Sequence, residues 1–339
     1  MYKLNKPILL NNTKLLFLSM MISSIIMAST TNSWMNLWMM MEINLLAFIP
    51  ILSNNNMLNS ESSMKYFLIQ SIASMILLMS IIFMWTNNKL TIKISTPINL
   101  TLMMKLGSAP FHFWFIQMVE KMNMINLMIL STLQKIIPMT AMMYMNQTTN
   151  LYLMILLNTT IGSINGINQT SLFKIISYSS INHIGWMMAA MTINQNSWKL
   201  YFLCYLIMMS SMTSMFHTLK MNTLPQLINS KNNKMIMLLF SMNLLSMGGL
   251  PPMMGFIPKW MIILHMTMNM NFLILSIMMM TSIITLYFYI KIIYSMILMN
   301  NTKMKWTKSY KQNMLNSMNL MQIMLSVWLM ITMNMMFFM

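Results

Sequence analysis

Residues 105–115 read KLGSAPFHFWF and place a lysine, a glycine and a proline inside an apolar segment that extends from about residue 97 to 119. Proline has no backbone N–H and its ring clashes with the carbonyl four residues earlier, so a helix cannot run through this stretch unbroken. In lipid, such a break is tolerated only where the backbone is buried in protein or lines a hydrated cavity. The stretch therefore predicts a broken membrane helix.

A second stretch of this kind reads MGGLPPMMGFIPKW at residues 247–260. It lies in an apolar run from 235 to 267, which is too long for one straight span. The run is either one broken helix or two helices, and the choice sets the topology of the second half of the chain.

The composition indicates a polytopic membrane protein. The chain is 57% hydrophobic and 7% charged, its mean hydropathy is +0.63, and apolar runs of about 20 residues recur from end to end. We predict an all-α fold of about 11 transmembrane helices. With 235–267 counted once, their approximate positions are 8–29, 33–53, 63–86, 97–119, 125–145, 151–168, 174–194, 198–219, 235–267, 272–298 and 315–338.

Residue usage indicates where the gene is translated. The chain has 57 Met, all 20 of its Lys and Arg residues are Lys, and its three acidic residues are all Glu, which favours codons built from A and T. Under a mitochondrial code in which ATA encodes Met, an AT-rich genome gives this profile, so we infer synthesis inside an invertebrate mitochondrion. Lys3 and Lys6 lead into the first span without an Arg-rich, Ser-rich transit peptide, in agreement with a mitochondrially encoded chain.

Lysines in the connections predict the orientation of the chain through the positive-inside rule. If 235–267 is one broken span, 13 lysines lie on the side of the N-terminus, and only Lys89, Lys93 and Lys199 lie on the opposite side. Two spans would change this ratio to 9 against 7. We therefore expect one broken helix in a multi-pass protein of the mitochondrial inner membrane, with its N-terminus in the matrix.

The two breaks predict an internal repeat. Helices one to five and six to ten form two runs, and the broken helix is the fourth in each. Because each run has an odd number of helices, the second run crosses the membrane in the opposite direction to the first. In transporters with such inverted repeats, discontinuous helices mark the transport site. The alternative is that the prolines merely kink packed helices. The predicted units are a first five-helix repeat at 8–146, an inverted five-helix repeat at 150–298, and a Lys-rich matrix loop with a C-terminal helix at 299–339.

Ionisable residues lie near the middle of four predicted spans: Glu42, Lys105, Lys135 and Lys259. A charge at mid-membrane costs about 2.5–3.5 kcal/mol unless it faces protein or water. A snorkelling lysine or a protonated glutamate is the alternative, but the lysines lie too deep for easy reach to an interface. The row of titratable groups therefore predicts a path for protons or ions.

Several other kinds of site are disfavoured. The net charge of +17 comes mostly from lysines in short connections, without a basic stripe interleaved with aromatic residues, so we expect no nucleic-acid partner. Cys204 is the only cysteine, and four dispersed histidines without nearby acids do not make a metal site. With no dinucleotide fingerprint and no iron–sulfur or haem ligand pattern, we expect no cofactor in this chain.

Five motifs resemble one known family. They are WMMMEINLLAFIPI (38–51), KLGSAPFHFW (105–114), STLQKIIP (131–138), KIISYSSINHIGWM (174–187) and GGLPPMMGFIPKW (248–260). Together, from about residue 14 to 298, they resemble the mitochondrial NADH-ubiquinone oxidoreductase chain 2 family, in its invertebrate type. Members are antiporter-like membrane subunits of respiratory complex I.

The resemblance implies a role for each central charge in a hydrated proton relay. Glu42 matches a transmembrane glutamate that pairs with Lys105; the carboxylate holds the ammonium charged, and separation of the two releases a proton. Lys135 matches the family's central lysine. Lys259 matches the lysine that passes protons toward the exit side.

Two histidines are weaker candidates for the same relay. His112 follows the first break, and His183 lies in the middle of a predicted helix beside Ser179, Ser180 and Asn182, whose side chains we expect to hold water. Histidine titrates near neutral pH and suits proton transfer. A histidine that is simply hydrogen-bonded in the bundle is the alternative for both.

The resemblance also implies an assembly. The expected function is that of a core membrane-arm subunit of an H+-translocating NADH:ubiquinone reductase, with homologous antiporter-like subunits and phospholipids as partners. NADH, FMN, iron–sulfur clusters and ubiquinone would be bound by partner subunits, which supply the redox energy. The alternatives are a stand-alone cation/proton antiporter and a structural scaffold whose central charges only lock helices together.

Overall fold

The computed structural model describes residues 12–53, 57–86, 91–145, 148–219, 221–229 and 234–301. Within these ranges every named element is a helix, and the β-type contact is an isolated antiparallel bridge between Ser171 and Thr223. The all-α class is thus confirmed for the part of the chain that the structure describes. Contacts divide the chain into two compact units, Met1–Gln147 and Thr148–Met339.

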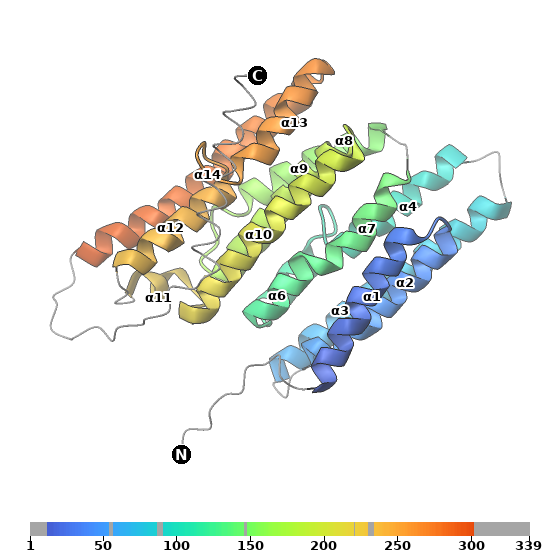
Figure 1. Cartoon of the computed structure of the whole chain (residues 1–339), viewed down its shortest axis with the longest axis horizontal. Helices are drawn as coiled ribbons and strands as arrows, with labels where there is room; N and C mark the ends of the chain where they lie inside the picture. Colours follow the sequence, from blue (N-terminus) through green and yellow to red (C-terminus); the bar gives the residue numbers. More distant parts are fainter. Residues whose placement is uncertain are drawn as a thin grey trace. The chain divides into compact units, whose positions relative to one another are not determined.

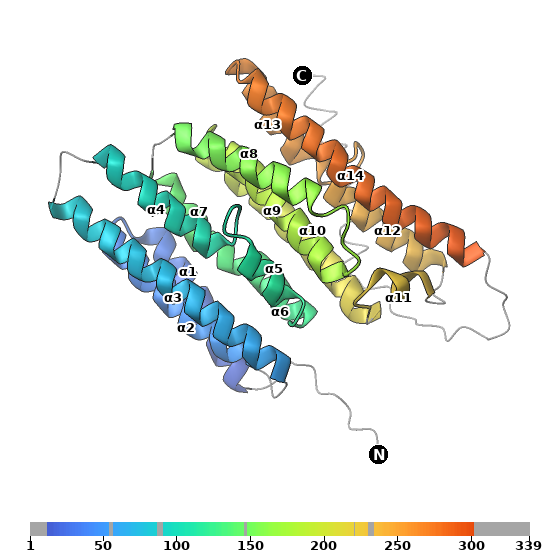
Figure 2. The same ribbon diagram turned by 180° about the vertical axis from the view of Figure 1, so that it is seen from behind.

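The first unit is a helical bundle (Figures 1 and 2), and polar side chains such as Asn44, Gln70 and Lys105 are buried inside it. Helices α1, α2 and α3 lie side by side, α4 packs on α3 and α7, and α7 also contacts α1 and α2. The faces of α2, α3, α4 and α7 therefore meet inside this unit. The described helices are α1 (Asn12–Thr30), α2 (Trp34–Leu52), α3 (Met57–Thr86), α4 (Thr91–Leu106), α5 (Phe113–Val119), α6 (Met124–Ser131) and α7 (Leu133–Met143).

The second unit is centred on α9, in which all residues from Ile175 to Ala190 are buried. This helix packs against α8, α10 and α13, while α14 contacts α8, α12 and α13. The described helices are α8 (Thr148–Ile164), α9 (Leu172–Met191), α10 (Gln195–Leu219), α11 (Leu224–Asn229), α12 (Lys234–Gly248), α13 (Phe256–Met268) and α14 (Phe272–Asn301).

Six helical segments in the described part of the chain are long and apolar enough to cross a membrane. Their outer faces suit lipid: on α3, Leu68, Ile72 and Met75 are each more than half exposed. The chain is therefore a polytopic membrane protein. The count of 11 spans and the inverted repeat remain predictions, and the expected last span at 315–338 lies outside the described residues. The six segments are Asn12–Thr30, Trp34–Leu52, Met57–Thr86, Met124–Met143, Gln195–His217 and Phe272–Met296.

Both predicted breaks occur, and the two helices before them end in the same way. Gly107 follows α4 with φ 65°, and Gly249 follows α12 with φ 80°. After each helix, the glycine N–H donates to the carbonyl three residues earlier, and the N–H of the next residue donates to the carbonyl five residues before it. This is the Schellman pattern. A left-handed glycine thus ends each half-helix and turns the chain toward a second one, α5 or α13.

The structure also contains a break that the sequence did not predict. The expected helix at 125–145 is divided into α6 and α7 at Thr132, which has the non-helical dihedral angles φ −117° and ψ −80°. The Thr132 hydroxyl donates to the carbonyl of Met128 at 2.5 Å, so the side chain occupies a backbone acceptor of the preceding turn. Six residues beyond the break lies Pro138, which cannot donate to the carbonyl of Gln134.

Replacing Gly107 by alanine tests the first cap. A left-handed conformation costs an L-residue about 1–2 kcal/mol, and the added Cβ would lie 2.9 Å from the Cβ of Phe115. We expect faster hydrogen exchange across residues 103–115 and a lower yield of assembled protein.

Gly248→Ala is the matched control, because Gly248 lacks the left-handed φ and the atom nearest to its added Cβ, 3.3 Å away, belongs to the flexible side chain of Leu286. If hydrogen exchange across residues 103–115 is no faster in Gly107→Ala than in Gly248→Ala, the structure does not require glycine at position 107.

Candidate functional site

The centre of the first unit is an ion pair between α2 and α4. Lys105 Nζ lies 3.6 Å from Glu42 Oε1, with side-chain exposures of 3% and 27%. Lys105 occupies the last turn of α4, where the negative end of the helix dipole favours an ammonium group. Its backbone carbonyl accepts a hydrogen bond from Gln70 Nε2 at 3.1 Å. The break in the helix therefore creates a site that binds a positive charge inside the bundle.

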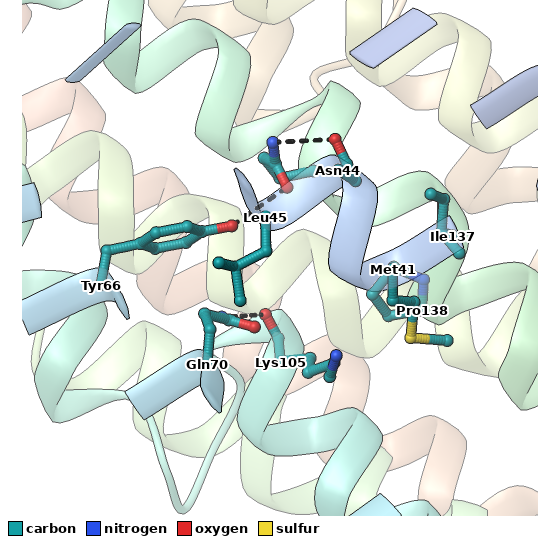
Figure 3. Close-up of a pocket in the computed structure, with 9 residues that line it drawn as sticks. Met41, Asn44, Leu45, Tyr66, Gln70, Lys105, Ile137 and Pro138 are labelled. Atoms are coloured by element: carbon teal, nitrogen blue, oxygen red, sulfur yellow. Dashed lines mark hydrogen bonds between the residues drawn. The ribbon is translucent and has the colours of Figure 1, made fainter. Parts of the chain in front are cut away.

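A small polar cavity of about 20 Å³ lies beside this pair (Figure 3). Tyr66 donates to Gln134 Oε1 at 3.1 Å, and Gln134 Nε2 donates to Asn44 Oδ1 at 3.2 Å, so a hydrogen-bonded chain connects α3, α7 and α2. The volume is sufficient for a water molecule, and the polar lining offers it partners. The cavity is lined by Met41, Asn44, Leu45, Tyr66, Gln70, Lys105, Gln134, Ile137 and Pro138.

A second cavity, of about 10 Å³, reaches Lys135. Lys135 is 2% exposed, and its Nζ lies 5.6 Å from the ring centroid of Phe115, within the range of a cation–π interaction. Three residues line both cavities: Tyr66, Lys105 and Gln134. The structure thus brings Lys105 and Lys135 together at two adjoining spaces of water size, with Glu42 beside Lys105.

His112 occupies a different place in the first unit. It precedes α5 as its N-cap residue, its Nδ1 lies 3.2 Å from the carbonyl oxygen of Pro110, and its ring stacks on Phe113 at 4.4 Å. It is buried, yet it is not among the residues that line either cavity. These contacts hold the connection between α4 and α5.

In the second unit, Lys259 lies at the other break. Its Nζ donates to the carbonyl of Gly248 at 2.8 Å and lies 5.6 Å from the ring centroid of Trp186. That carbonyl ends α12, so this ammonium also binds at the negative end of a broken helix. Lys105 comes from the half-helix before its break and Lys259 from the half-helix after it, yet both are buried at the same kind of helix end.

His183 lies one turn before Trp186 on α9, and its partner differs from our expectation. Its Nδ1 lies 2.9 Å from the Tyr201 hydroxyl on α10. The hydroxyls of Ser179 and Ser180, which we expected to hold water beside it, donate instead to carbonyls of their own helix. A serine in a helix commonly donates to a carbonyl three or four residues back, and its oxygen can still accept a hydrogen bond, so the expectation that these residues hold water beside His183 stays a prediction.

Sequence reasoning missed four residues of these sites: Tyr66, Gln70, Gln134 and Tyr201. Two signals were available. Tyr66 and Gln70 are four residues apart on one helix and so share a face, and Gln134 is a polar neighbour of Lys135 inside an apolar span. For Tyr201, the partner of a histidine on another helix, the sequence carries no signal. In the described residues, no three His, Cys, Asp or Glu side chains come together as metal ligands.

Comparison with solved structures defines the class of fold. A chain of respiratory complex I from Thermus thermophilus matches with a TM-score of 0.81 at 18% identity, over 94% of this chain and 78% of that chain. A chain of the Mrp complex from Dietzia sp. matches with a TM-score of 0.73 at 16% identity, over 81% of this chain and 59% of that chain. The chain therefore has the fold of a chain found in each of these two complexes.

Sequence comparison then gives the family. Residues 31–285 match the family of NADH:quinone oxidoreductase/Mrp antiporter transmembrane proteins. NADH-ubiquinone oxidoreductase chain 2 of Anopheles gambiae is 43% identical, over 90% of this chain and 91% of that protein; the chain 2 of Bos taurus is 40% identical, over 86% and 89%. The chain belongs to this family, and the resemblance carried by the five motifs is confirmed.

A double-mutant cycle of Glu42→Gln and Lys105→Met measures the ion pair. Removal of one partner from a buried pair costs about 3–5 kcal/mol, so we expect each single variant to destabilise the chain and the double variant to lose less than their sum. The readout is the temperature at which the chain dissociates from the detergent-solubilised assembly. Glu61 and Lys65, a solvent-accessible pair at 3.0 Å in which Glu61 also pairs with Lys121, provide the control cycle and should show weaker coupling. Additive losses for Glu42 and Lys105 would contradict a direct interaction.

Proposed function

We propose that this chain is the chain 2 type membrane subunit of a mitochondrial NADH:ubiquinone oxidoreductase and translocates protons across the inner membrane. The observation that carries the proposal is the partly buried Glu42–Lys105 pair at a helix break, with cavities of water size between Lys105 and Lys135. It stands in a chain whose relatives, about 40% identical over most of its length, are named as NADH-ubiquinone oxidoreductase chain 2.

In the proposed mechanism the pair acts as a switch. With Glu42 close, the Lys105 ammonium is stabilised by the carboxylate and by the end of α4. When the pair separates, burial favours the neutral amine and the proton leaves toward Lys135 through the cavities. Lys135 then holds the proton.

In the second unit, we assign the onward steps to Lys259 and His183. Both are buried, and Trp186, one turn from His183 on α9, lies against the Lys259 ammonium. The Tyr201 hydroxyl fixes the orientation of His183 and supplies a group through which a proton can pass. For His112, the relay role stays a prediction, because its observed contacts are with the connection between α4 and α5.

The proposal includes the predicted topology and assembly. The N-terminus lies in the matrix, the units 8–146 and 150–298 are inverted repeats, and neighbouring antiporter-like subunits and phospholipids cover the apolar outer faces. The enzyme activity belongs to the assembly: partner subunits carry NADH oxidation and quinone reduction, and the energy reaches this chain as a conformational or electrostatic change at Glu42.

Lys135→Met in the assembled complex tests the proposal. The substitution retains the apolar stem and removes the titratable group. In proteoliposomes we therefore expect either a lower number of protons translocated per electron or a slower rate of NADH oxidation coupled to translocation. Lys199→Met, at an exposed lysine, is the control and should leave the ratio unchanged. A wild-type proton-to-electron ratio in a correctly assembled Lys135→Met complex would favour the interpretation that the chain is a structural scaffold.

A native gel distinguishes a complex I subunit from a stand-alone antiporter. If the chain is a subunit, an antibody to it should detect it in the band that stains for NADH dehydrogenase activity. Migration apart from that activity, with the active band intact, would support the antiporter instead.

A further inference from the structure

The two cavities of the first unit adjoin at the Tyr66–Gln134 hydrogen bond. Gln70 and Asn44 line only the first cavity, and Lys135 lines only the second. Tyr66 and Gln134 line both, and the Tyr66 hydroxyl donates to Gln134 Oε1 at 3.1 Å. Lys105, the third residue common to both, is the proton donor of the proposed switch.

The position of the Tyr66 hydroxyl is fixed by packing on every side. The ring makes an edge contact with Phe48 at 5.1 Å and a tilted contact with Trp114 at 6.1 Å. Its hydrogen-bond acceptor is also held, because Gln134 Nε2 donates to Asn44 Oδ1 and this orients the amide oxygen toward Tyr66. Figure 3 shows the Tyr66 ring extending across the cavity toward the helix that carries Asn44.

The backbone of α7 adds a further acceptor at the same place. Pro138 has no N–H to donate to the carbonyl of Gln134, four residues earlier. Both residues line the first cavity, so this carbonyl is available to a water molecule there. A water in that cavity then has partners in the Gln134 carbonyl, the Tyr66 hydroxyl and Lys105.

From this geometry we propose that the Tyr66 hydroxyl carries the proton between the two cavities and that Gln134 holds it in place, so that Lys105 and Lys135 exchange protons through Tyr66. The proposal rests on the proton-translocating function proposed above and adds the connecting group. Tyr66 is the transfer residue because its oxygen bonds the moving proton, and Gln134 is a positioning residue.

The step conserves charge and involves no electrons. The Lys105 ammonium gives a proton to the water of the first cavity and becomes a neutral amine. That water protonates the Tyr66 oxygen as Tyr66 releases its own hydroxyl proton to water in the second cavity, and the Lys135 amine accepts a proton to become ammonium. Rotation of the hydroxyl back to Gln134 Oε1 restores the starting state, which is the state observed here.

Between transfers the bond to Gln134 holds the Tyr66 hydroxyl at the junction of the two cavities, and it opens and re-forms once in each transfer. A purely structural role, in which the bond only satisfies a buried hydroxyl, predicts stability effects but no effect on proton transfer.

The test is Tyr66→Phe in the assembled complex, which keeps the ring against Phe48 and Trp114 and removes the hydroxyl. A positioned acid–base group contributes about 10²–10⁴-fold to proton transfer. We therefore expect coupled NADH:ubiquinone turnover in proteoliposomes to fall about 10-fold or more, and its solvent deuterium isotope effect to rise as transfer becomes limiting. Tyr144→Phe, at a tyrosine that is 47% exposed in the same unit, is the control and should retain both values.

Gln134 provides a second test that holds even if Tyr66→Phe fails to assemble. Gln134→Met removes the acceptor of the hydroxyl and should reproduce the slow, isotope-sensitive turnover, while Gln134→Glu restores an acceptor oxygen at the same distance along the side chain and should recover part of the rate. Wild-type turnover and isotope effect in Gln134→Met would overturn the positioning role.

Parallel variants separate this proposal from the function on which it rests. If Lys105→Met and Lys135→Met lose proton translocation while Tyr66→Phe keeps the wild-type rate and isotope effect, the bridge is refuted and the proposed function stands. If all three variants translocate protons normally, the proposed function itself fails, and the bridge fails with it.

Discussion

The structure depends on one constraint: a charge inside a membrane bundle needs partners from within the protein. Glu42 and Lys105 meet this need with an ion pair at 3.6 Å and a helix end. At this separation the attraction is about 4 kcal/mol for a partly buried pair, and moving one proton against 100 mV costs about 2.3 kcal/mol. Opening and closing one such pair therefore involves enough free energy to drive a proton against the membrane potential.

The two helix breaks serve that constraint. In both units a left-handed glycine ends a half-helix, and a buried lysine lies at the negative end that results, Lys105 beside α4 and Lys259 on the carbonyl of Gly248. An unbroken helix offers no such end at membrane depth, because its carbonyls are bonded within the helix. In the first unit the end of α4 also lies beside two small cavities, so the break there both stabilises a charge and adjoins space for water.

The sequence predicted these features well because they depend on local chemistry. Gly107 and Gly249 with the neighbouring prolines require breaks whatever surrounds them, and lysines such as Lys135 stand out in an apolar run. The break at Thr132 was missed because nothing local marks it: a threonine hydroxyl bonded to the carbonyl four residues earlier also occurs at Thr159 and Thr213, inside unbroken helices. Partners such as Tyr201 for His183, and Gln134 for Tyr66, were missed because they join helices far apart in sequence, and only tertiary packing brings them together.

A density map of the assembled complex that resolves ordered water tests the account most directly. The account predicts water in both cavities of the first unit, hydrogen-bonded on one side to Lys105 and on the other to Lys135, with the Tyr66 hydroxyl between them. Cavities filled by apolar side chains in every conformational state, with Lys105 and Lys135 separated by dry packing, would contradict it.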